Sequence, residues 1–480
     1  MNTEIFDMVA KTFQGLEDVL AEELRELGAT NVEPGRRMVS FQGDKEMLYK
    51  ANLHCRTALR VLKPFYSFRA HTPEKLYDRV KEYDWTNLLD ATKTFAIDVT
   101  VNSSEFTNSR FVTYRVKDAI VDYFTDRDPQ GKRPSVRLTD ADVILNVHIS
   151  ESDVTLSLDS SGESLHKRGW REAQTEAPIN EVLAAGIILK TGWRGDAPFI
   201  DPMCGSGTFL VEAALIAANI APGIYRKEFA FERWADFDAE LWERLYNDDS
   251  AERDIHCPII GADMSPKAVA IATANLKRAG IASSVTIELK PLSQWTKAPA
   301  NGVLVTNPPY GERLRPDDID SLYSLIGSQL KHIFTGYHAW IIGYRDEQFA
   351  KIGLAPSCKE PLFNGSLECE LREYVIFSGD KKSFRASGGS LHTRNRAERK
   401  HNKSNRPLDK SRKPFTRKKD DKIRNNREKT ETPKPEPSEN PLAARRNPDA
   451  LKAIIGKQPS ISARKIRHRK STDGEQNPNL

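Results

Sequence analysis

Cysteine is scarce in this 480-residue chain, and long apolar runs are missing. The five cysteines are scattered without the paired spacing that a disulfide framework or a zinc site requires, which fits a reducing compartment. No run of about 18 apolar residues is present, and the first residues lack the pattern of a signal peptide. These absences predict a soluble, cytoplasmic protein that does not span a membrane and holds no metal ion.

Charge is divided unevenly along the chain. Residues 381–480 contain 29 Lys and Arg against 11 Asp and Glu, a net charge of +18, whereas residues 1–380 contain 43 against 56, a net charge of −13. The tail has two aromatic residues and too little apolar surface to form a core, so we expect it to be disordered. A basic arm beside an acidic body favours a polyanionic partner, most simply RNA, and a solubilising extension is the alternative.

A motif suited to holding a planar amino group, Asn307-Pro308-Pro309-Tyr310, follows an apolar run. The amine of a purine is a poor nucleophile because its lone pair is delocalised into the ring. The amide oxygen of Asn307 and a backbone carbonyl near Pro308 can each accept one N–H, which leaves electron density facing an electrophile. Tyr310 offers a ring on which a base can stack. An ordinary turn at the end of a strand is the alternative.

A glycine-rich turn lies upstream, in the stretch 199–208, and opens onto a good helix former. Gly205 and Gly207 let a ligand approach the backbone closely. No lysine follows these glycines, which excludes a P-loop, and the third glycine of the dinucleotide fingerprint is absent. Asp263 ends a second apolar strand and can accept both ribose hydroxyls of a nucleoside, with a helix N-cap as the alternative. The order of glycine-rich turn, acidic strand end and Asn-Pro-Pro-Tyr is specific to S-adenosylmethionine-dependent amino methyltransferases.

The pattern along the chain predicts an α/β protein with several segments. Residues 1–60 form a small βαβ-type module, and a second α/β unit follows. The alternation of strands and helices after residue 196 is typical of a doubly wound parallel sheet. The spacing between Gly207 and Asp263 is longer than in a simple βαβ unit, and the excess is about 30 residues from position 221 onward. We expect this insertion beside the cofactor site, either as a helical lid or as an extra packed helix. The predicted segments are 1–60, 61–160, a connector at 161–195, a catalytic domain at 196–380 and the tail at 381–480.

These motifs together resemble one known family over about residues 1–380. The chain is similar to the 23S rRNA guanine-N2 methyltransferases, which pair an N-terminal RNA-binding THUMP region with a class I, Rossmann-like methyltransferase domain. The resemblance implies that residues 1–60 are a ferredoxin-like module, that 61–160 are the THUMP domain and that both grip RNA. It also implies a single methyltransferase domain before the tail. The matching stretches are 116–122, 158–169, 177–178, 201–208, 221–223 and 307–314.

The resemblance also implies roles for individual residues. Asp201, Gly205 and Gly207 would line the methionine side of the cofactor, and Asp263 would hold its ribose. Asn307, Pro308 and Tyr310 would receive the target base. The family usually has an acidic residue near the cofactor adenine where this chain has Pro291, so backbone groups or Leu292 would make that contact. The remaining residues of the expected cofactor site are Pro202, Thr208 and Met264.

The sequence therefore predicts transfer of a methyl group from S-adenosylmethionine to N2 of a guanine in 23S rRNA or in a precursor of the large subunit. Positioning and carbonyl acceptors suffice, because the sulfonium methyl group is already a strong electrophile. We expect the target base to be unstacked before it enters the pocket. N6 methylation of adenine in RNA and methylation of a protein glutamine are rivals, since the same motif serves all three. An RNA-binding ribosome assembly factor without activity is a rival from another class.

Deletion of residues 381–480 should leave a folded protein that binds cofactor but binds RNA less tightly. Each phosphate that a Lys or Arg neutralises contributes about −0.9 to the slope of log affinity against log salt on a duplex, and less on single strands. Truncation should therefore make this slope shallower by several units, with little dependence on RNA sequence. Filter binding of full-length and truncated protein across a salt series measures the slope. Equal slopes would show that the tail does not contact RNA.

Overall fold

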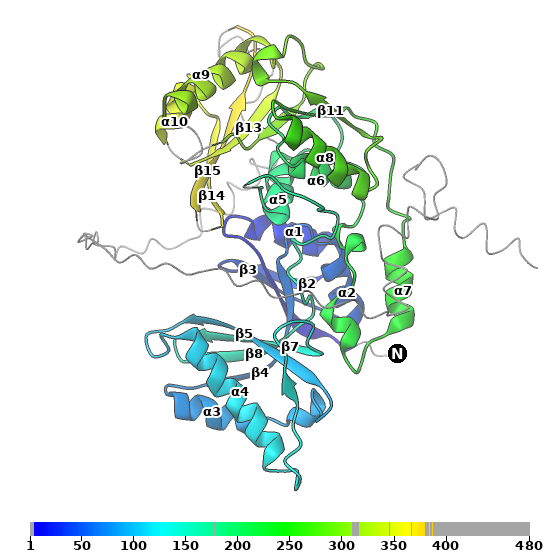
Figure 1. Ribbon diagram of the computed structural model, residues 1–480, viewed down its shortest axis with the longest axis vertical. Helices are drawn as coiled ribbons and strands as arrows, with labels where there is room; N and C mark the ends of the chain where they lie inside the picture. The colour runs from blue at the N-terminus through cyan, green and yellow to red at the C-terminus, as the bar shows by residue number, and fades with distance from the viewer. Residues whose placement is uncertain are drawn as a thin grey trace, which may run out of the picture.

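The computed structural model describes residues 4–176, 178–309, 316–344, 346–365 and 367–379, together with Phe384 and Ala386. The predicted disorder of residues 381–480 falls, apart from those two residues, outside the described residues, and so does Tyr310. Two sheets organise the described part, and each has its own helices (Figure 1). No helix in this part is long and apolar enough to cross a membrane.

The first sheet has eight strands in the order β2-β3-β1-β4-β8-β7-β5-β6. β4 joins its two halves, because Arg60–Leu62 pair with β1 while Leu62–Arg69 pair with β8. The predicted boundary at residue 60 thus falls at the start of a strand that both halves share. The strands are β1 (Phe6–Lys11), β2 (Thr30–Pro34), β3 (Met38–Gly43), β4 (Arg60–Arg69), β5 (Thr94–Asn102), β6 (Ser135–Val136), β7 (Val143–Ser150) and β8 (Asp153–Asp159).

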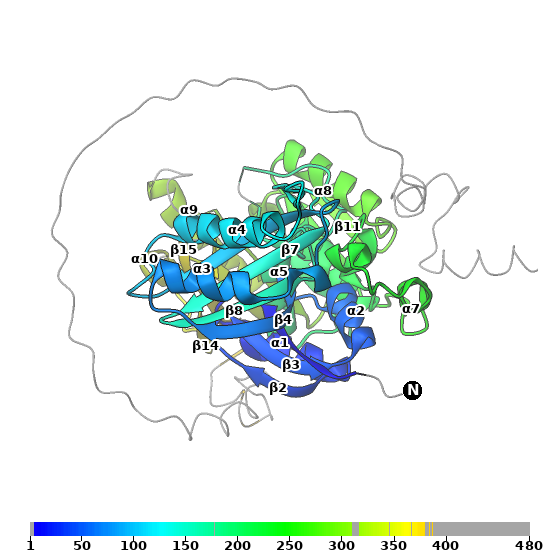
Figure 2. The same cartoon turned by 90° about the horizontal axis from the view of Figure 1, so that it is seen from below.

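Helices give each half of this sheet a separate core. α1 (Glu17–Glu26) and α2 (Lys45–His54) belong to the first half. The second half has α3 (Pro73–Glu82), a short 3-10 turn η1 (Trp85–Asn87) and α4 (Ser109–Thr125). Figure 2 shows α3 and α4 side by side over one face of the sheet.

The βαβ-type module expected for residues 1–60 is split, because β3 lies between β1 and β2 in the sheet. The order is β1-α1-β2-β3-α2-β4, and every strand pairing within it is antiparallel. β2 gave no sequence signal because four of its five residues are exposed, so the strand shows no alternation of apolar and polar positions.

The second sheet has seven strands in the order β11-β10-β9-β12-β13-β15-β14. The five strands β11, β10, β9, β12 and β13 are parallel to one another. β15 pairs antiparallel with both β13 and β14, so the sheet is mixed rather than wholly parallel as expected. Strand order reverses between β9 and β12, and ligands of such sheets bind where the strands end beside this reversal. The strands are β9 (Phe199–Asp201), β10 (Ile259–Asp263), β11 (Val285–Leu289), β12 (Val303–Thr306), β13 (His338–Gly343), β14 (Cys358–Asn364) and β15 (Leu367–Val375).

Helices pack on both faces of the second sheet and form two cores. One face carries α5 (Glu181–Thr191), α6 (Thr208–Ala217) and α8 (Pro266–Arg278). The other carries α9 (Pro316–His332) and α10 (Asp346–Lys351), with the 3-10 turn η4 (Leu292–Gln294) beside α9.

Helix α5 connects the catalytic domain to the first half of the N-terminal sheet. The side chain of Asn180 begins the helix by accepting a hydrogen bond from Val182 N at 2.9 Å, and Gly192 ends it at φ +81°. All eleven residues of α5 are buried. Gly186 leaves room for Leu16, which precedes α1, because an added Cβ would lie only 2.5 Å from a methyl carbon of Leu16. The connector is therefore part of a packed interface.

The insertion is a packed element and not a lid. It forms η2 (Pro222–Tyr225), η3 (Ala230–Arg233) and α7 (Ala239–Asn247), and α7 lies beside α2 in both views (Figures 1 and 2). The ring of Phe231 stacks on Tyr49 with centroids 4.4 Å apart. None of residues 221–253 lines the cavity described below. The alternative of an extra packed helix is therefore correct, and the insertion joins the catalytic domain to the N-terminal core.

One buried guanidinium fixes the connector to this insertion. Arg226 is 5% exposed and donates hydrogen bonds to the carbonyl oxygens of Ser161, Glu163, Ser164 and Lys167, at 2.6–3.2 Å. Burial lowers its pKa to about 10, so the side chain stays charged at neutral pH. Four carbonyl groups of the connector thus accept hydrogen bonds from one side chain.

Phe231→Ala should destabilise the protein by about 3–5 kcal/mol, because the ring is fully buried between Tyr49 and Trp242. Urea denaturation followed by tryptophan fluorescence measures the change. Phe111→Ala is the control, since Phe111 is 49% exposed on α4 and its loss should change stability by less than about 0.5 kcal/mol. Equal effects of the two substitutions would contradict the packed interface.

Candidate active site

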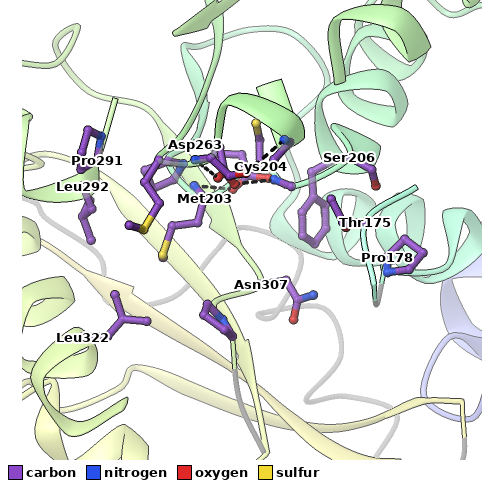
Figure 3. A pocket seen from close by; sticks show the side chains of 18 of the residues that line it. Thr175, Pro178, Met203, Cys204, Ser206, Asp263, Pro291, Leu292, Asn307 and Leu322 are labelled. Carbon is purple, nitrogen blue, oxygen red and sulfur yellow. Dashed lines mark hydrogen bonds between the residues drawn. The ribbon is translucent and has the colours of Figure 1, made fainter. Parts of the chain in front are cut away.

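A cavity of about 680 Å³ lies where β9, β10 and β12 end, beside the reversal of strand order. Figure 3 shows Thr175 and Pro178 of the connector at one end of it and Pro291 and Leu292 at the other. Gly207 and Pro308 do not line the cavity, and Tyr310 lies outside the described residues. The cavity brings together most of the residues expected from the sequence, namely Asp201, Pro202, Gly205, Thr208, Asp263, Met264, Leu292 and Asn307.

The two glycines of the turn after β9 have different tasks. Gly205 has φ +53° and lines the cavity, and a Cβ there would lie 3.7 Å from Thr175 Oγ1, an ordinary contact distance. Gly207 has φ +78° and precedes the first residue of α6. A Cβ at Gly207 would lie 3.0 Å from the Cβ of Ala272, so this glycine also lets α6 approach α8.

Arg171 of the connector holds the side chains of this turn, and the sequence gave no indication of it. Its guanidinium donates to Ser206 Oγ at 3.1 Å and to Thr208 Oγ1 at 2.9 Å. Glu181 of α5 in turn accepts a hydrogen bond from Arg171 Nε at 2.6 Å. The shape of the turn therefore depends on a charge pair from two other segments.

Asn275 of α8 holds the backbone of the same turn and was also missed. Its side chain is fully buried, and Nδ2 donates to the carbonyls of Ser206 at 2.9 Å and Ala173 at 3.1 Å. Its Oδ1 accepts from Glu172 N at 2.9 Å. Asn275 thus joins the connector segment at residues 172–173 to the glycine-rich turn. An asparagine within a helix carries no spacing that would predict this.

Asp201 is a buried carboxyl at the end of β9. It is 1% exposed and accepts hydrogen bonds from Thr306 Oγ1 at 3.0 Å and Met203 N at 3.2 Å. Burial raises its pKa to about 7, and the neighbouring Asp263 also raises it. Near neutral pH this group is therefore divided between its neutral and ionised forms. The site can supply a negative charge once a cation lies beside it.

Asp263 is a cavity carboxylate and not the cap of α8. Its two oxygens accept hydrogen bonds from Gly205 N and Ser265 N, each at 2.9 Å. The helix cap is Ser265, whose hydroxyl accepts from Ala268 N at 3.3 Å. A carboxylate has about four acceptor positions, so Asp263 can still accept two hydroxyl groups.

Asn307 follows β12 directly and lines the cavity. Its Oδ1 is shielded from solvent and has no hydrogen-bond partner among the described residues. Figure 3 shows the side chain below the glycine-rich turn. A buried carbonyl oxygen without a donor is costly, so this atom retains the capacity to accept a hydrogen bond.

The end of the cavity near η4 is apolar. Leu292 is 7% exposed, Pro291 stands beside it, and Met264 is 75% exposed although it is a large apolar residue. A flat aromatic ring fits such walls.

Cys204 lies in the turn but is 6% exposed, and burial raises the pKa of its thiol well above the usual range. It packs as a small residue and has no thiolate character. In the described part of the chain, no group of three or more His, Cys, Asp or Glu could hold a metal ion.

Family models match three parts of the chain. Residues 7–62 match an RlmL ferredoxin-like domain, 70–159 match a THUMP domain and 168–373 match an RMKL-like methyltransferase domain. The first two matches coincide with the two halves of the first sheet, and the third covers most of the connector and the second sheet.

Individual relatives agree with the family models. A ribosomal RNA large subunit methyltransferase K/L of Syntrophotalea carbinolica is 40% identical over 80% of this chain and 56% of its own length. A Synechocystis protein named "Putative RNA methyltransferase slr0064" is 37% identical over 77% of this chain and 96% of its own length. The chain thus spans about half of the K/L relatives but nearly all of the Synechocystis protein.

Two solved structures superpose on most of the chain. SMU.472, described as "a putative methyltransferase complexed with SAH", has a TM-score of 0.70, with 34% identity over 79% of this chain and 100% of its own. A "predicted N6-adenine-specific DNA methylase" from Listeria monocytogenes has a TM-score of 0.69, with 31% identity over 78% of this chain and 97% of its own. The chain therefore belongs to the family of THUMP-domain methyltransferases that includes the ribosomal RNA large subunit methyltransferases K/L.

Proposed function

We propose that the protein transfers a methyl group from S-adenosylmethionine to the exocyclic N2 amine of a guanine in 23S rRNA. The observation that carries the proposal is Asn307, which lines the same cavity as a glycine-rich turn and two carboxyl groups and whose Oδ1 has no hydrogen-bond partner among the described residues. In the transfer, the bond from sulfur to the methyl carbon breaks as a bond from that carbon to the amine nitrogen forms. The amine then loses a proton to solvent.

The cavity suits the proposed cofactor along its whole length. Asp201 provides a negative charge for the cationic methionine end, and Gly205 lets that end approach the backbone. Asp263 has acceptor positions left for the ribose hydroxyls. Met264 and Leu292 provide apolar walls for the adenine. Gly207 does not line the cavity and contributes indirectly, by fixing the start of α6.

The acceptor position rests on Asn307 together with a backbone carbonyl near Pro308. Two acceptors fix both N–H bonds of the amine and turn its lone pair toward the methyl group. Tyr310 remains the proposed stacking partner of the base. RNA as substrate is supported by the THUMP match and by the names of the K/L and Synechocystis relatives. The two halves of the first sheet would then hold the RNA while its target base enters the cavity.

Methylation of adenine N6 is the second candidate, because one similar structure is described as an N6-adenine-specific DNA methylase. A protein that only binds RNA is disfavoured by the unpartnered Asn307 oxygen and by the shaped cavity. Incubation of full-length protein with S-adenosylmethionine and an unmodified 23S rRNA transcript, followed by nucleoside mass analysis, tests the proposal. N2-methylguanosine supports it, and N6-methyladenosine alone or no methylated nucleoside refutes it.

Asn307→Ala should remove methyl transfer while cofactor affinity stays nearly unchanged. The substitution deletes one preorganised acceptor, which costs about 2–4 kcal/mol of transition-state stabilisation. Single-turnover methylation and calorimetric binding of S-adenosylmethionine measure the two quantities. Ser293→Ala removes a hydroxyl from the same cavity and serves as the control. Turnover by Asn307→Ala at the rate of that control would rule out the assigned role.

Asp263→Ala should weaken binding of S-adenosylmethionine, because two ribose hydroxyls lose a charged acceptor worth roughly 1.5–3 kcal/mol per hydrogen bond. Part of the effect comes through Gly205, whose N–H loses its partner. Ser265→Ala removes the cap of α8 and leaves the carboxylate, so it separates the two roles. Calorimetry gives both dissociation constants. An unchanged constant for Asp263→Ala would leave its carboxylate without a ligand role.

A further inference from the structure

The amine-binding motif cannot by itself distinguish guanine from adenine. Both bases present a planar amine, and two acceptors near Asn307 satisfy either one. The two bases differ at N1, the ring atom next to the amine. Guanine N1 carries a hydrogen and donates, whereas adenine N1 is a bare acceptor. A residue that places an acceptor beside N1 therefore favours guanine over adenine.

The cavity has four carboxyl groups that could serve, and two of them are already engaged. Asp201 accepts from Thr306 and Met203, and Asp263 accepts from Gly205 and Ser265. Both lie at the glycine-rich turn, where the cofactor is placed.

The other two carboxyl groups stand at different walls. Glu176 belongs to the connector, next to Thr175 and Pro178, which Figure 3 shows across the cavity from Leu322. Asp318 belongs to α9, the helix that follows Asn307 along the chain, and it lines the same cavity.

The residues of α9 that line the cavity show which face of this helix is turned toward it. Asp318, Leu322 and Leu325 all line the cavity, and their spacing of four and then three residues places them along one face of a helix. The two leucines form an apolar wall and Asp318 is the charged residue on that face. Since it is exposed to the cavity rather than buried in the core, its carboxylate is available to a bound base.

A plain explanation for an acid near the start of a helix is its interaction with the helix dipole. Asp320 shows what such a residue looks like in this helix. It forms an ion pair with Lys351 of α10 at 2.6 Å and does not line the cavity. Asp318 lines the cavity whereas Asp320 pairs with α10, so substitution of Asp320 is a matched control for substitution of Asp318.

We propose that Asp318 selects guanine. Its carboxylate accepts the N1–H of a base whose N2 amine is held at Asn307, and it repels the bare N1 of adenine. The inference rests on the proposed function and names the residue that sets its base specificity. A hydrogen bond from the N1–H of guanine to a charged acceptor should favour guanine over adenine by about 10- to 100-fold.

The experiment compares two bases that share the N2 amine. Once the methylated guanosine is mapped on the 23S rRNA transcript, a synthetic RNA fragment of that stretch is made with guanosine or with 2-aminopurine riboside at the target. 2-Aminopurine keeps the N2 amine but has a bare N1. Full-length protein should methylate the guanosine fragment with a kcat/KM about 100-fold higher.

Asp318→Asn should lower the ratio of the two kcat/KM values by at least about 10-fold, because its amide can donate to a bare N1. Asp318→Glu, which keeps a carboxylate, should preserve a preference for guanosine, and Asp320→Asn should leave the ratio unchanged. The missing O6 of 2-aminopurine affects all variants alike and cancels in the comparison. Calorimetric cofactor affinity and circular dichroism show that each variant is folded.

Two failures can be told apart. If the unmodified protein makes no N2-methylguanosine on the transcript, the proposed function fails and Asp318 loses its role with it. If the protein methylates guanosine but Asp318→Asn keeps the full ratio, or Asp320→Asn loses it equally, the assignment of Asp318 alone is overturned.

Discussion

The turn between β9 and α6 has to keep its backbone accessible to a ligand, so its shape must be held from outside. Three segments do this. Arg171 binds its hydroxyl side chains, Asn275 binds the carbonyl of Ser206, and Asp263 binds the N–H of Gly205. Each of these partners comes from a different part of the chain. The cavity therefore exists only when the connector, β10 and α8 are all docked, and the candidate site is a property of the whole catalytic domain.

The same connector also docks onto the N-terminal half of the protein. The carbonyl groups of residues 161–167 converge on Arg226, and α5 is buried between α1 and the second sheet. Because β4 belongs to both halves of the first sheet, no flexible joint separates those halves from each other within the described residues. Buried contacts of the connector thus link the first sheet to the domain that contains the cavity.

The sequence predicted the residues at strand ends and failed on the residues that support them. Asp201 and Asp263 end apolar strands and Asn307 follows one, and parallel strands bring such positions to one edge. Arg171 and Asn275 contact backbone and side-chain atoms that are distant in sequence, so no local pattern marks them. The exposed strand β2 lacked alternation, and the insertion gave no sign of its partner Tyr49, since one chain does not reveal which aromatic residues meet.

Asp201 has a consequence for proton exchange with the medium. Its pKa of about 7 lies above the value of an exposed carboxyl, so the folded protein retains a proton there that the unfolded chain has released, and this group's contribution to stability is lost as pH rises toward 7. A sulfonium placed beside it reverses that balance and expels the proton. Binding of the proposed cofactor would therefore release acid and weaken by up to about tenfold for each pH unit below 7. In this proposed placement, the neutral sulfur left after transfer would no longer attract the Asp201 carboxylate.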